Sequence, residues 1–282
     1  CVGHDSGVSS SVGGCLVKLP LGIEATWGYR RFILGSVIQE VRAKYAESLL
    51  GAMWAVLQPL TLIVIYSVIF SQVMAPNLPG YDQPYAYTVF LCSGMLLWIF
   101  FMELLTRSVG VFVQNGGLLK KVNFPRLSLP LIALLSALLN YLIIMVLFIA
   151  LLLLTGFVPG QSIVAAIPVV IITAGFAVGL GLLGATLNVY YRDIEQLTGV
   201  LAQFWFWLTP IIYPPQVVPD HFRSVFEWNP IFPLVVAMQD VFLRGVWPQW
   251  QTLMFPAVSA LLALCLGALV YFKLGDDITD EF

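Results

Sequence analysis

The hydrophobic residues of this chain are gathered into six long blocks, which polar or turn-forming segments separate. The blocks run over residues 49–74, 85–102, 129–154, 164–189, 197–213 and 253–272. A helix needs ~20 residues to cross ~30 Å of hydrocarbon at ~1.5 Å per residue, so each block is long enough to span a membrane. The pattern therefore predicts an all-α integral membrane protein with six transmembrane helices.

The residues before the first block follow a different pattern. Over residues 29–50, apolar residues recur at three- and four-residue steps, namely at Leu34, Val37 or Ile38, Val41, Tyr45 and Leu49. Most of the charged residues fall off this stripe, which is typical of a helix with one apolar face. We therefore predict an amphipathic helix that lies in the membrane interface and leads into the first span. It either only anchors the domain or also borders an opening from the cytoplasm.

The stretch between the last two blocks, residues 214–251, is long, yet residues 231–243 within it (IFPLVVAMQDVFL) are apolar. A segment of this length is too short to cross the hydrocarbon layer. Because backbone N–H and C=O groups inside a bilayer must form hydrogen bonds within the protein, helical structure is favoured for these residues. We predict re-entrant or interfacial helices here, on the outer side, that begin at Asn229-Pro230, since Pro suits the first turn of a helix.

The fourth block contains a series of small residues: Gly175, Gly179, Gly181 and Gly184. Small residues let two helices approach closely in lipid. The series therefore predicts a tight helix contact, either within one subunit or between two subunits.

Positive charge is distributed unevenly between the two sides that six spans would create. Ten of the thirteen Lys and Arg residues fall on one side: Arg30, Arg31, Arg42, Lys44, Arg107, Lys120, Lys121, Arg126, Arg192 and Lys273. The other side carries Arg223 and Arg244, and Lys18 lies in the N-terminal segment. By the positive-inside rule, both chain termini face the cytoplasm. An odd number of spans would break this separation.

Composition excludes several classes of protein. Of the 282 residues, 60% are hydrophobic and 10% are charged, so the chain is no ordinary soluble domain. The net charge of −2 says little, because the distribution of charge between the two sides carries the information, and we expect no nucleic-acid partner. The four cysteines form no CxxC pair and the two histidines lie far apart, so we expect neither a metal site nor catalytic residues. Residues 29–282 are expected to form one membrane domain. Residues 1–28, rich in Ser and Gly, are expected to be a disordered tail or an artefact.

The segment between the second and third blocks, residues 103–126, is too apolar for a solvated linker and too charged for a span. The segment combines apolar residues with lysines: Val111, Leu118, Leu119, Lys120, Lys121 and Val122. This combination predicts a short helix that docks on a protein partner, although Lys120, Lys121 and Arg126 also fit plain positive-inside anchoring. Glu103, at the start of the segment, is a candidate acid for a proton relay.

Four motifs occur in the same order as in a known family: residues 120–126 (KKVNFPR), 188–196 (NVYYRDIEQ), 209–219 (TPIIYPPQVVP) and 228–230 (WNP). Together with six spans and an amphipathic N-terminal helix, they make residues 29–282 resemble the permease subunits of ABC-type polysaccharide exporters. These subunits serve O-antigen, capsule and wall-teichoic-acid export. The resemblance implies export of a lipid-linked polysaccharide across the bacterial cytoplasmic, or inner, membrane.

The resemblance also implies partners. Two copies of this subunit would join two ATP-binding cassette subunits in the lipid bilayer. No GxxxxGK[ST] motif occurs in this chain, so ATP and Mg²⁺ are expected on the partner, and this chain is expected to hold no cofactor and to be no enzyme. The implied ATPase-coupling residues are Asn115, Leu118, Leu119, Lys120, Lys121, Arg126, Arg192, Asp193 and Glu195. The implied outer gate spans about residues 217–244 and includes Asn229, Pro230, Asp240 and Arg244. A simpler reading of Asp193 is an acid that favours a helix N-terminus.

The fifth block carries four consecutive aromatic residues. Aromatic faces stack on the CH faces of sugars and still allow sliding, so the candidate channel-lining residues are Gln203, Phe204, Trp205, Phe206, Trp207 and Tyr213. Successive residues point in all directions around a helix, so only part of the run can face a channel, and Phe204 and Trp207 share one face. The alternative is an aromatic belt at the membrane interface.

Three other functions compete with polysaccharide export. A permease of the same broad class could carry a drug or a lipid. A membrane-embedded glycan polymerase or acyltransferase needs clustered acid, base or cationic groups, for which the outer side offers Asp220, His221, Arg223, Glu227, Asp240 and Arg244. An ion-coupled carrier would bury ionisable groups near the membrane midplane, and these spans have almost none.

Overall fold

The computed structural model describes residues 29–46, 86–117, 126–154, 156, 160–217 and 220–274, with separate positions between residues 53 and 65. The regular structure within these ranges is helical throughout, which confirms the all-α prediction for this part of the chain. Residues 1–28 and most of the first apolar block lie outside the described residues.

The elements follow the chain in the order α2 (Arg30–Ala46), α4 (Ala86–Gln114), α6 (Ser128–Leu154), η3 (Gln161–Ala165), α7 (Ala166–Tyr190), α8 (Asp193–Trp207), η4 (Pro215–Val217), α9 (Asp220–Glu227), α10 (Ile231–Gln239), η5 (Asp240–Arg244) and α11 (Trp250–Leu274). The elements η3 and η4 are 3-10 helices, and η5 is a turn of π-helix. Within the described residues, α4, α6, α7 with η3, and α11 are each long and apolar enough to cross a membrane. They correspond to the second, third, fourth and sixth apolar blocks.

Two helices have bounds that differ from the predicted spans. Helix α4 continues through residues 103–114, which hydropathy assigned to a connecting segment. Helix α8 covers Asp193–Trp207 instead of residues 197–213. Its 15 residues reach about 22 Å at ~1.5 Å per residue. Pro210, which lacks an N–H, follows soon after its end. Helix ends therefore depend on backbone hydrogen bonding as well as on hydropathy.

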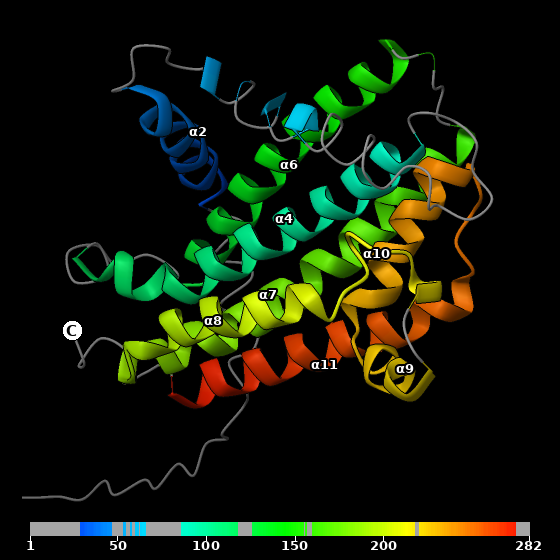
Figure 1. Cartoon of the computed structure of the whole chain (residues 1–282). Coiled ribbons are helices and arrows are strands. Elements are labelled where there is room, and N and C mark those ends of the chain that lie inside the picture. Colours follow the sequence, from blue (N-terminus) through cyan, green and yellow to red (C-terminus); the bar gives the residue numbers. More distant parts are fainter. Residues whose placement is uncertain are drawn as a thin grey trace, which may run out of the picture.

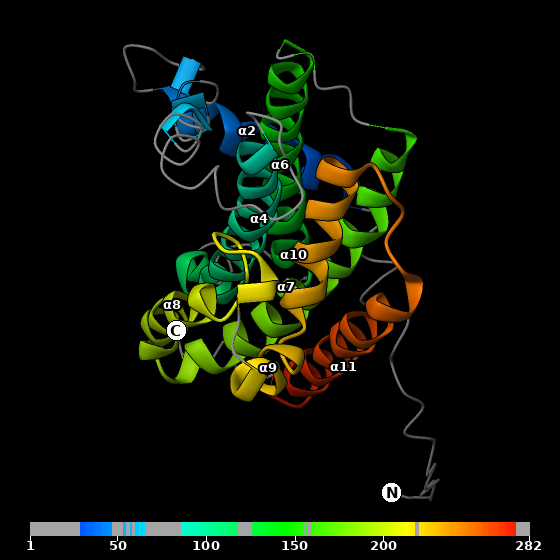
Figure 2. The same ribbon diagram turned by 45° about the vertical axis from the view of Figure 1, so that its right-hand side comes forward.

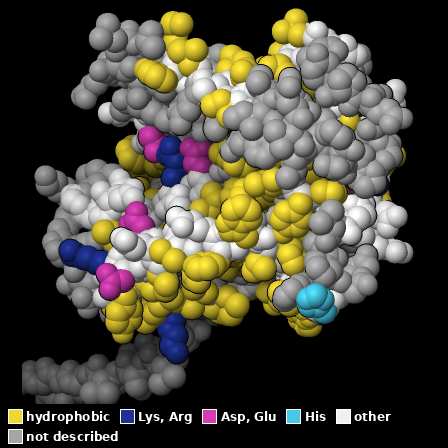
Figure 3. All heavy atoms as spheres, in the orientation of Figure 1, with side chains coloured by type: hydrophobic (Ala, Val, Ile, Leu, Met, Phe, Trp, Pro, Cys, Tyr) yellow, Lys and Arg dark blue, Asp and Glu magenta, His cyan; other side chains and the backbone are white. Residues whose placement is uncertain are grey.

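Helix α4 lies at the centre of the molecule (Figure 1). In its most apolar stretch 78% of the residues are buried, against 28–33% in the other three long helices. Helices α6, α7 and α10 all pack on it. The outer helices keep apolar side chains exposed, and yellow side chains cover much of the face drawn in Figure 3. A surface of this kind is typical of a protein that is covered by lipid.

The glycines of α7 form tight contacts within the subunit. A Cβ added to Gly179 would lie 2.5 Å from the backbone N of Leu264 on α11, and one added to Gly267 would lie 2.5 Å from the carbonyl oxygen of Gly179. On the other side, Gly181 and Gly184 face Ser108 and Val109 of α4. The close helix contact predicted from this series is confirmed, and it lies between α7 and its neighbours α4 and α11.

Helix α2 lies beside α6 and far from α11 in both ribbon views (Figures 1 and 2). Ile33 and Val37 are buried, whereas Leu34 and Ile38 are exposed. The predicted apolar stripe is thus divided between a face toward the protein and a face away from it. Such a division suits a helix that packs on the protein and borders lipid.

Candidate functional site

Polar side chains of α2, α4 and α6 meet where these helices come together. We call this group the charged cluster: Glu40, Glu103, Arg107, Ser136 and Asn140. Glu103 and Arg107 are one helical turn apart on α4, as are Ser136 and Asn140 on α6, so each helix presents two polar groups on one face. Acidic and basic side chains are visible together in a recess of the surface in Figure 3.

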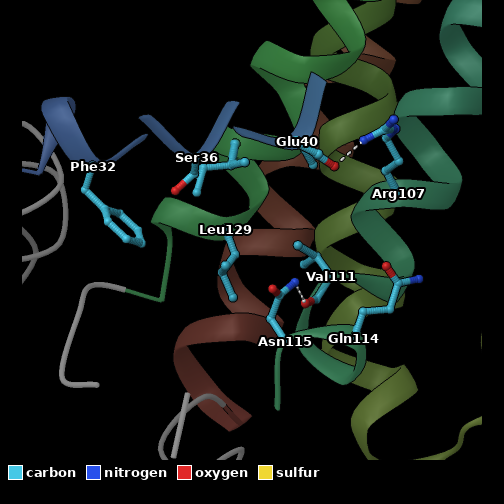
Figure 4. A pocket seen from close by; sticks show the side chains of 10 residues that line it. Phe32, Ser36, Glu40, Arg107, Val111, Gln114, Asn115 and Leu129 are labelled. Atoms are coloured by element: carbon cyan, nitrogen blue, oxygen red, sulfur yellow. Dashed lines mark hydrogen bonds and ion pairs between the residues drawn. The ribbon is translucent and has the colours of Figure 1, made fainter. Parts of the chain in front are cut away.

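Arg107 is the centre of the charged cluster. Its guanidinium donates to Glu40 at 2.6 Å (Figure 4) and approaches Glu103 at 3.2 Å. Each carboxylate has a second donor, because Asn140 Nδ2 donates to Glu103 at 2.6 Å and the Ser136 hydroxyl donates to Glu40. Side-chain exposure rises from 17% for Glu103 to 28% for Arg107 and 43% for Glu40. Water therefore screens the Glu40–Arg107 pair, and such pairs contribute only about 0–1 kcal/mol.

A cavity of about 260 Å³ lies beside the charged cluster. Its walls come from α2, α4 and α6 and include Phe32, Ser36, Glu40, Arg107, Gln114, Asn115 and Leu129 (Figure 4). Asn115 Nδ2 donates to the Val111 carbonyl at 2.9 Å, which fixes the amide at the wall. The cavity thus combines amide, hydroxyl and ionic groups with apolar ones, and α2 closes one side of it.

A second junction connects α4 and α7 to the start of α8. The buried Asn188 donates to the Val109 carbonyl at 3.3 Å and accepts from the backbone N–H of Glu195 at 3.2 Å. Gln114, at the end of α4, donates to the Glu195 carboxylate at 3.2 Å. Asn188 therefore satisfies one of the N–H groups that a helix start leaves without a partner. The ends of α4 and α7 and the start of α8 are held as one unit.

A buried amide joins α8 to α10. We call this group the Asn229 cluster: Asn229, Trp205, Thr209 and the backbone of Leu208 and Ile231. Asn229 Oδ1 accepts from the Trp205 indole at 2.8 Å and from the Ile231 N–H at 3.0 Å. Its Nδ2 donates to the Leu208 carbonyl at 2.9 Å and to the Thr209 hydroxyl at 3.0 Å. All four hydrogen-bonding positions of the amide are used. Helix α10 begins directly after Asn229-Pro230, as predicted.

The four consecutive aromatic residues of α8 divide into two pairs. Trp205 packs on Phe101 of α4, with ring centroids 5.5 Å apart, and Phe206 packs on Trp98 at 5.6 Å. Phe204 and Trp207 are instead 68% and 63% exposed, and Gln203 beside them is exposed too. The Tyr213 hydroxyl donates to the Trp207 carbonyl at 2.6 Å. Helical spacing thus places Phe204 and Trp207 together on the outward face.

A second cavity of about 240 Å³ lies between the predicted gate, the start of α4 and the turn after α8, and we call it the hairpin cavity. Its walls are formed by Phe90, Pro214, Pro215, Gln216, Phe232, Val236, Gln239, Asp240, Leu243 and Arg244. The Arg244 guanidinium lies 3.3 Å from the Asp240 carboxylate. Burial raises the pKa of Asp240, and the charge of Arg244 opposes this shift. Within the described residues, no three metal-binding side chains come together.

The predicted ATPase-coupling residues are only partly described. Leu118, Leu119, Lys120 and Lys121 lie outside the described residues. Asn115 borders the first cavity, and Arg126 precedes α6 and is half-buried. Arg192 and Asp193 are exposed at the start of α8, where Asp193 occupies the first turn. Glu195 is exposed as well, and its contacts with Gln114 and Asn188 link it to α4 and α7.

The sequence analysis missed the charged cluster as a unit and the role of Asn188. A signal was present, because Ser136 and Asn140 are polar residues one turn apart in the otherwise apolar sequence of α6. Glu103 and Arg107 have the same spacing on α4. The partner helix of such a pair, however, cannot be read from spacing within one helix.

Comparison with known proteins gives consistent matches. A sequence profile described as ABC-2 type transporter matches residues 33–243. The O-antigen export system permease protein RfbA of Klebsiella pneumoniae is 31% identical over 208 residues, which cover 73% of this chain and 78% of that protein. The protein of the same name from Myxococcus xanthus is 28% identical over 88% of this chain and 94% of its own length. The polysialic acid transport protein KpsM of Escherichia coli is 24% identical over 83% of this chain and 90% of its own length.

Proposed function

This chain belongs to the ABC-2 type transporter family, and on that premise we propose that it is the membrane-spanning subunit of an ATP-driven polysaccharide exporter. It moves a lipid-linked polysaccharide across the bacterial cytoplasmic membrane. The observation that carries the proposal is the likeness to O-antigen export permeases and to a polysialic acid transport protein over most of the chain. Hydrolysis of ATP takes place on two separate ATP-binding cassette subunits, which bind a dimer of this chain.

The proposed subunit has six spans with both termini in the cytoplasm. Helices α4, α6, α7 and α11 supply four spans, residues 49–74 supply the first, and α8 with the turns after it supplies the fifth. Charge supports this orientation, because Arg126 precedes α6, Arg192 precedes α8 and Lys273 lies at the end of α11. These three ends fall on one side if the spans alternate in direction. Helices α9 and α10 then form the outer re-entrant gate.

The junction around Asn188 supports a route from the ATPase into the membrane. In this proposal the ATPase contacts residues 115–121 and the start of α8. Gln114 and Glu195 connect these two contact regions directly, at 3.2 Å. Because Asn188 also holds α4 to α7 and α8, a push on either region moves the three helices together. Coupling therefore does not depend on one loop alone.

The exposed face of α8 supports a role in the polymer path. Phe204 and Trp207 present aromatic faces outward, with Gln203 beside them, while Trp205 and Phe206 fix the helix to α4. In the proposed dimer these two outward rings line the channel, where they stack on sugars without holding the polymer in one register. The Asn229 cluster connects this helix to α10, so that the channel wall and the gate move as one body.

The proposed function is tested in the source bacterium. Deletion of this gene should leave lipid-linked polymer inside the cell, and the wild-type gene should restore polymer at the surface. The double variant Lys120→Glu/Lys121→Glu should reach the membrane in normal amount yet export little, because reversed charges weaken docking to the ATPase. Lys273→Glu is the matched control, since it reverses one positive charge on the same side and should export normally. Unchanged surface polymer in the deletion strain would contradict the function.

A further inference from the structure

The hairpin cavity lies between parts of the chain that are far apart in sequence. Phe90 comes from the start of α4, Gln216 from the turn after α8, and Asp240 from η5. In the proposed orientation this cavity lies on the outer side, because the start of α4 faces outward. Asp240 and Arg244 belong to the predicted outer gate, but no ligand has been assigned to the interior of the cavity, which is lined by both apolar and polar groups.

We infer that the hairpin cavity binds one sugar ring of the polymer on the outer side of the membrane. The inference rests on the proposed export function and adds to it a holding site near the exit. A site there would keep the emerging chain from sliding back while the gate resets.

Charge in the cavity favours a neutral ligand that is rich in hydroxyl groups. Asp240 and Arg244 lie 3.3 Å apart, so their charges are already paired. A phosphate would have to displace Asp240 from Arg244, and a cation would have to displace Arg244. A hydroxyl group both donates and accepts, so neighbouring hydroxyls of one ring can bind the carboxylate and the guanidinium without separating them.

The apolar wall and the volume favour a single ring. Phe90, Phe232, Pro214 and Pro215 offer aromatic and pyrrolidine surfaces on which the CH face of a sugar can pack. The volume of about 240 Å³ is below the ~300–1,000 Å³ that is usual for drug-sized ligands. A lipid tail would remove water from the Gln216 amide and from the Asp240–Arg244 pair without supplying a hydrogen-bonding group, which is costly.

The cavity is held in shape before any ligand binds. Gln239 Nε2 donates to the Pro210 carbonyl at 3.0 Å, and the Tyr87 hydroxyl donates to the Ile212 carbonyl at 2.6 Å. These bonds fix the turn after α8 against α10 and α4. The side-chain oxygen of Gln239 is buried and accepts no hydrogen bond from the residues that the structure describes, so a hydroxyl beside it would supply a donor. A preformed site avoids part of the entropy cost of binding.

The π-helical turn η5 gives independent support. Turns of this kind are rare and are frequently found at functional sites. This one spans Asp240–Arg244 and so contains both charged groups of the cavity, and Gly245 at φ 64° ends it. The Ser162 hydroxyl donates to the Val241 carbonyl at 3.3 Å and secures the turn from the side of η3.

Photocrosslinking in exporting cells tests the inference. Gln216 lies exposed at the rim of the cavity, so Gln216→benzoylphenylalanine should leave the fold intact. Illumination should attach polymer to this variant, visible as a high-mass smear that disappears when polymer synthesis is blocked. Leu266→benzoylphenylalanine, on the exposed apolar side of α11, is the matched control and should attach no polymer.

Two further variants connect the adduct to the cavity chemistry. Asp240→Asn and Arg244→Gln should each lower the adduct yield about tenfold at equal subunit levels, as expected for one lost charge-assisted hydrogen bond. Lys273→Gln, at the exposed end of α11 and outside the gate, should not change it.

Two results would overturn the inference while export itself stands: a Gln216 variant that exports normally without a polymer adduct, or an adduct formed only with a second copy of the subunit. Surface polymer that persists in the deletion strain would instead reject the proposed function.

Discussion

The charged cluster and the Asn229 cluster both join helices through polar side chains, but they do so by different physical means. In the charged cluster, Arg107 lies between two carboxylates, and Glu40 on α2 is 43% exposed. In the Asn229 cluster, one neutral amide makes four hydrogen bonds and is only 7% exposed. The first group depends on charge in a place that water reaches. The second depends on geometry in a place that water does not reach.

This difference indicates which helices can move. Attraction between charges weakens gradually with distance, so α2 can shift against α4 and α6 at low cost. The hydrogen bonds of the Asn229 side-chain amide require one arrangement of the helices, because hydrogen bonds weaken steeply when they bend or lengthen. Helices α8 and α10 therefore move together, whereas α2 is a separately adjustable part that borders the first cavity.

Asn229→Leu should produce the largest effect. The side chain has similar size, yet it removes four hydrogen bonds and leaves the half-buried Trp205 indole N–H and the buried Ile231 N–H without their acceptor. At about 1–3 kcal/mol for each orphaned group, the free energy of unfolding should fall by about 3–5 kcal/mol. Denaturant unfolding of the purified subunit in detergent measures this. Trp228→Phe, at the 78% exposed neighbour, is the control and should unfold like the wild type.

Trp205→Phe should have a smaller effect in the same cluster. It removes the indole donor but keeps a ring against Phe101 and Phe176, and Asn229 Oδ1 retains the Ile231 N–H. We expect a loss of about 1–2 kcal/mol in the free energy of unfolding. Trp207→Phe makes the same chemical change at an exposed ring and should cost almost nothing. Equal losses at the two positions would show that ring size, and not the Asn229 bond, determines stability.

The charged cluster should show weaker coupling. A double-mutant cycle with Glu40→Gln and Arg107→Gln should give an interaction energy of about 0–1 kcal/mol, because water reaches the pair. Denaturant unfolding of the wild type, the two single variants and the double variant provides the four free energies of unfolding that the cycle needs. A coupling above about 3 kcal/mol would mean that this pair is as dry as the Asn229 cluster, and the comparison between the two groups would fail.

Ionic strength should have the smallest effect, and it should act on the charged cluster alone. Raising ionic strength from about 0.01 M to 0.5 M shortens the Debye length from about 30 Å to less than 8 Å, so part of the Glu40–Arg107 coupling should disappear. The expected change is a few tenths of a kcal/mol. The penalty of Asn229→Leu should not change, since no ionised group is involved. A parallel decrease in the Glu40–Arg107 interaction energy and in the Asn229→Leu penalty would indicate a general salt effect on the detergent-bound protein.

Much of the membrane fold could be predicted from hydropathy alone. Helices α6 and α11 and the η3–α7 unit are uniformly apolar, so composition and length identify them directly. The extension of α4 past residue 102 could not be predicted in this way, because Glu103 and Arg107 lower local hydropathy although helical bonding continues. Their charges are accommodated by each other and by α6, a contact that hydropathy does not detect.

The candidate site could be predicted only where the signal is local. Asn229-Pro230 as a helix start, and Phe204 with Trp207 on one face, both follow from spacing along a single helix. The contacts of Asn229 with Trp205 and of Arg107 with Glu40 join residues 24 and 67 positions apart. Such pairs depend on how the helices pack, and a single sequence contains no direct record of them.

The contact between Gly179 on α7 and Gly267 on α11 makes the far end of α11 a practical observation point. At the ends of the two helices, the Tyr190 hydroxyl also donates to the Leu274 carbonyl at 3.2 Å. A spectroscopic label placed at Lys273 would thus travel with α7 and report its displacement during the ATP-driven cycle that is proposed for this chain. Distance changes between two such labels in the proposed dimer could be followed in a native membrane without altering any residue of the proposed polymer path.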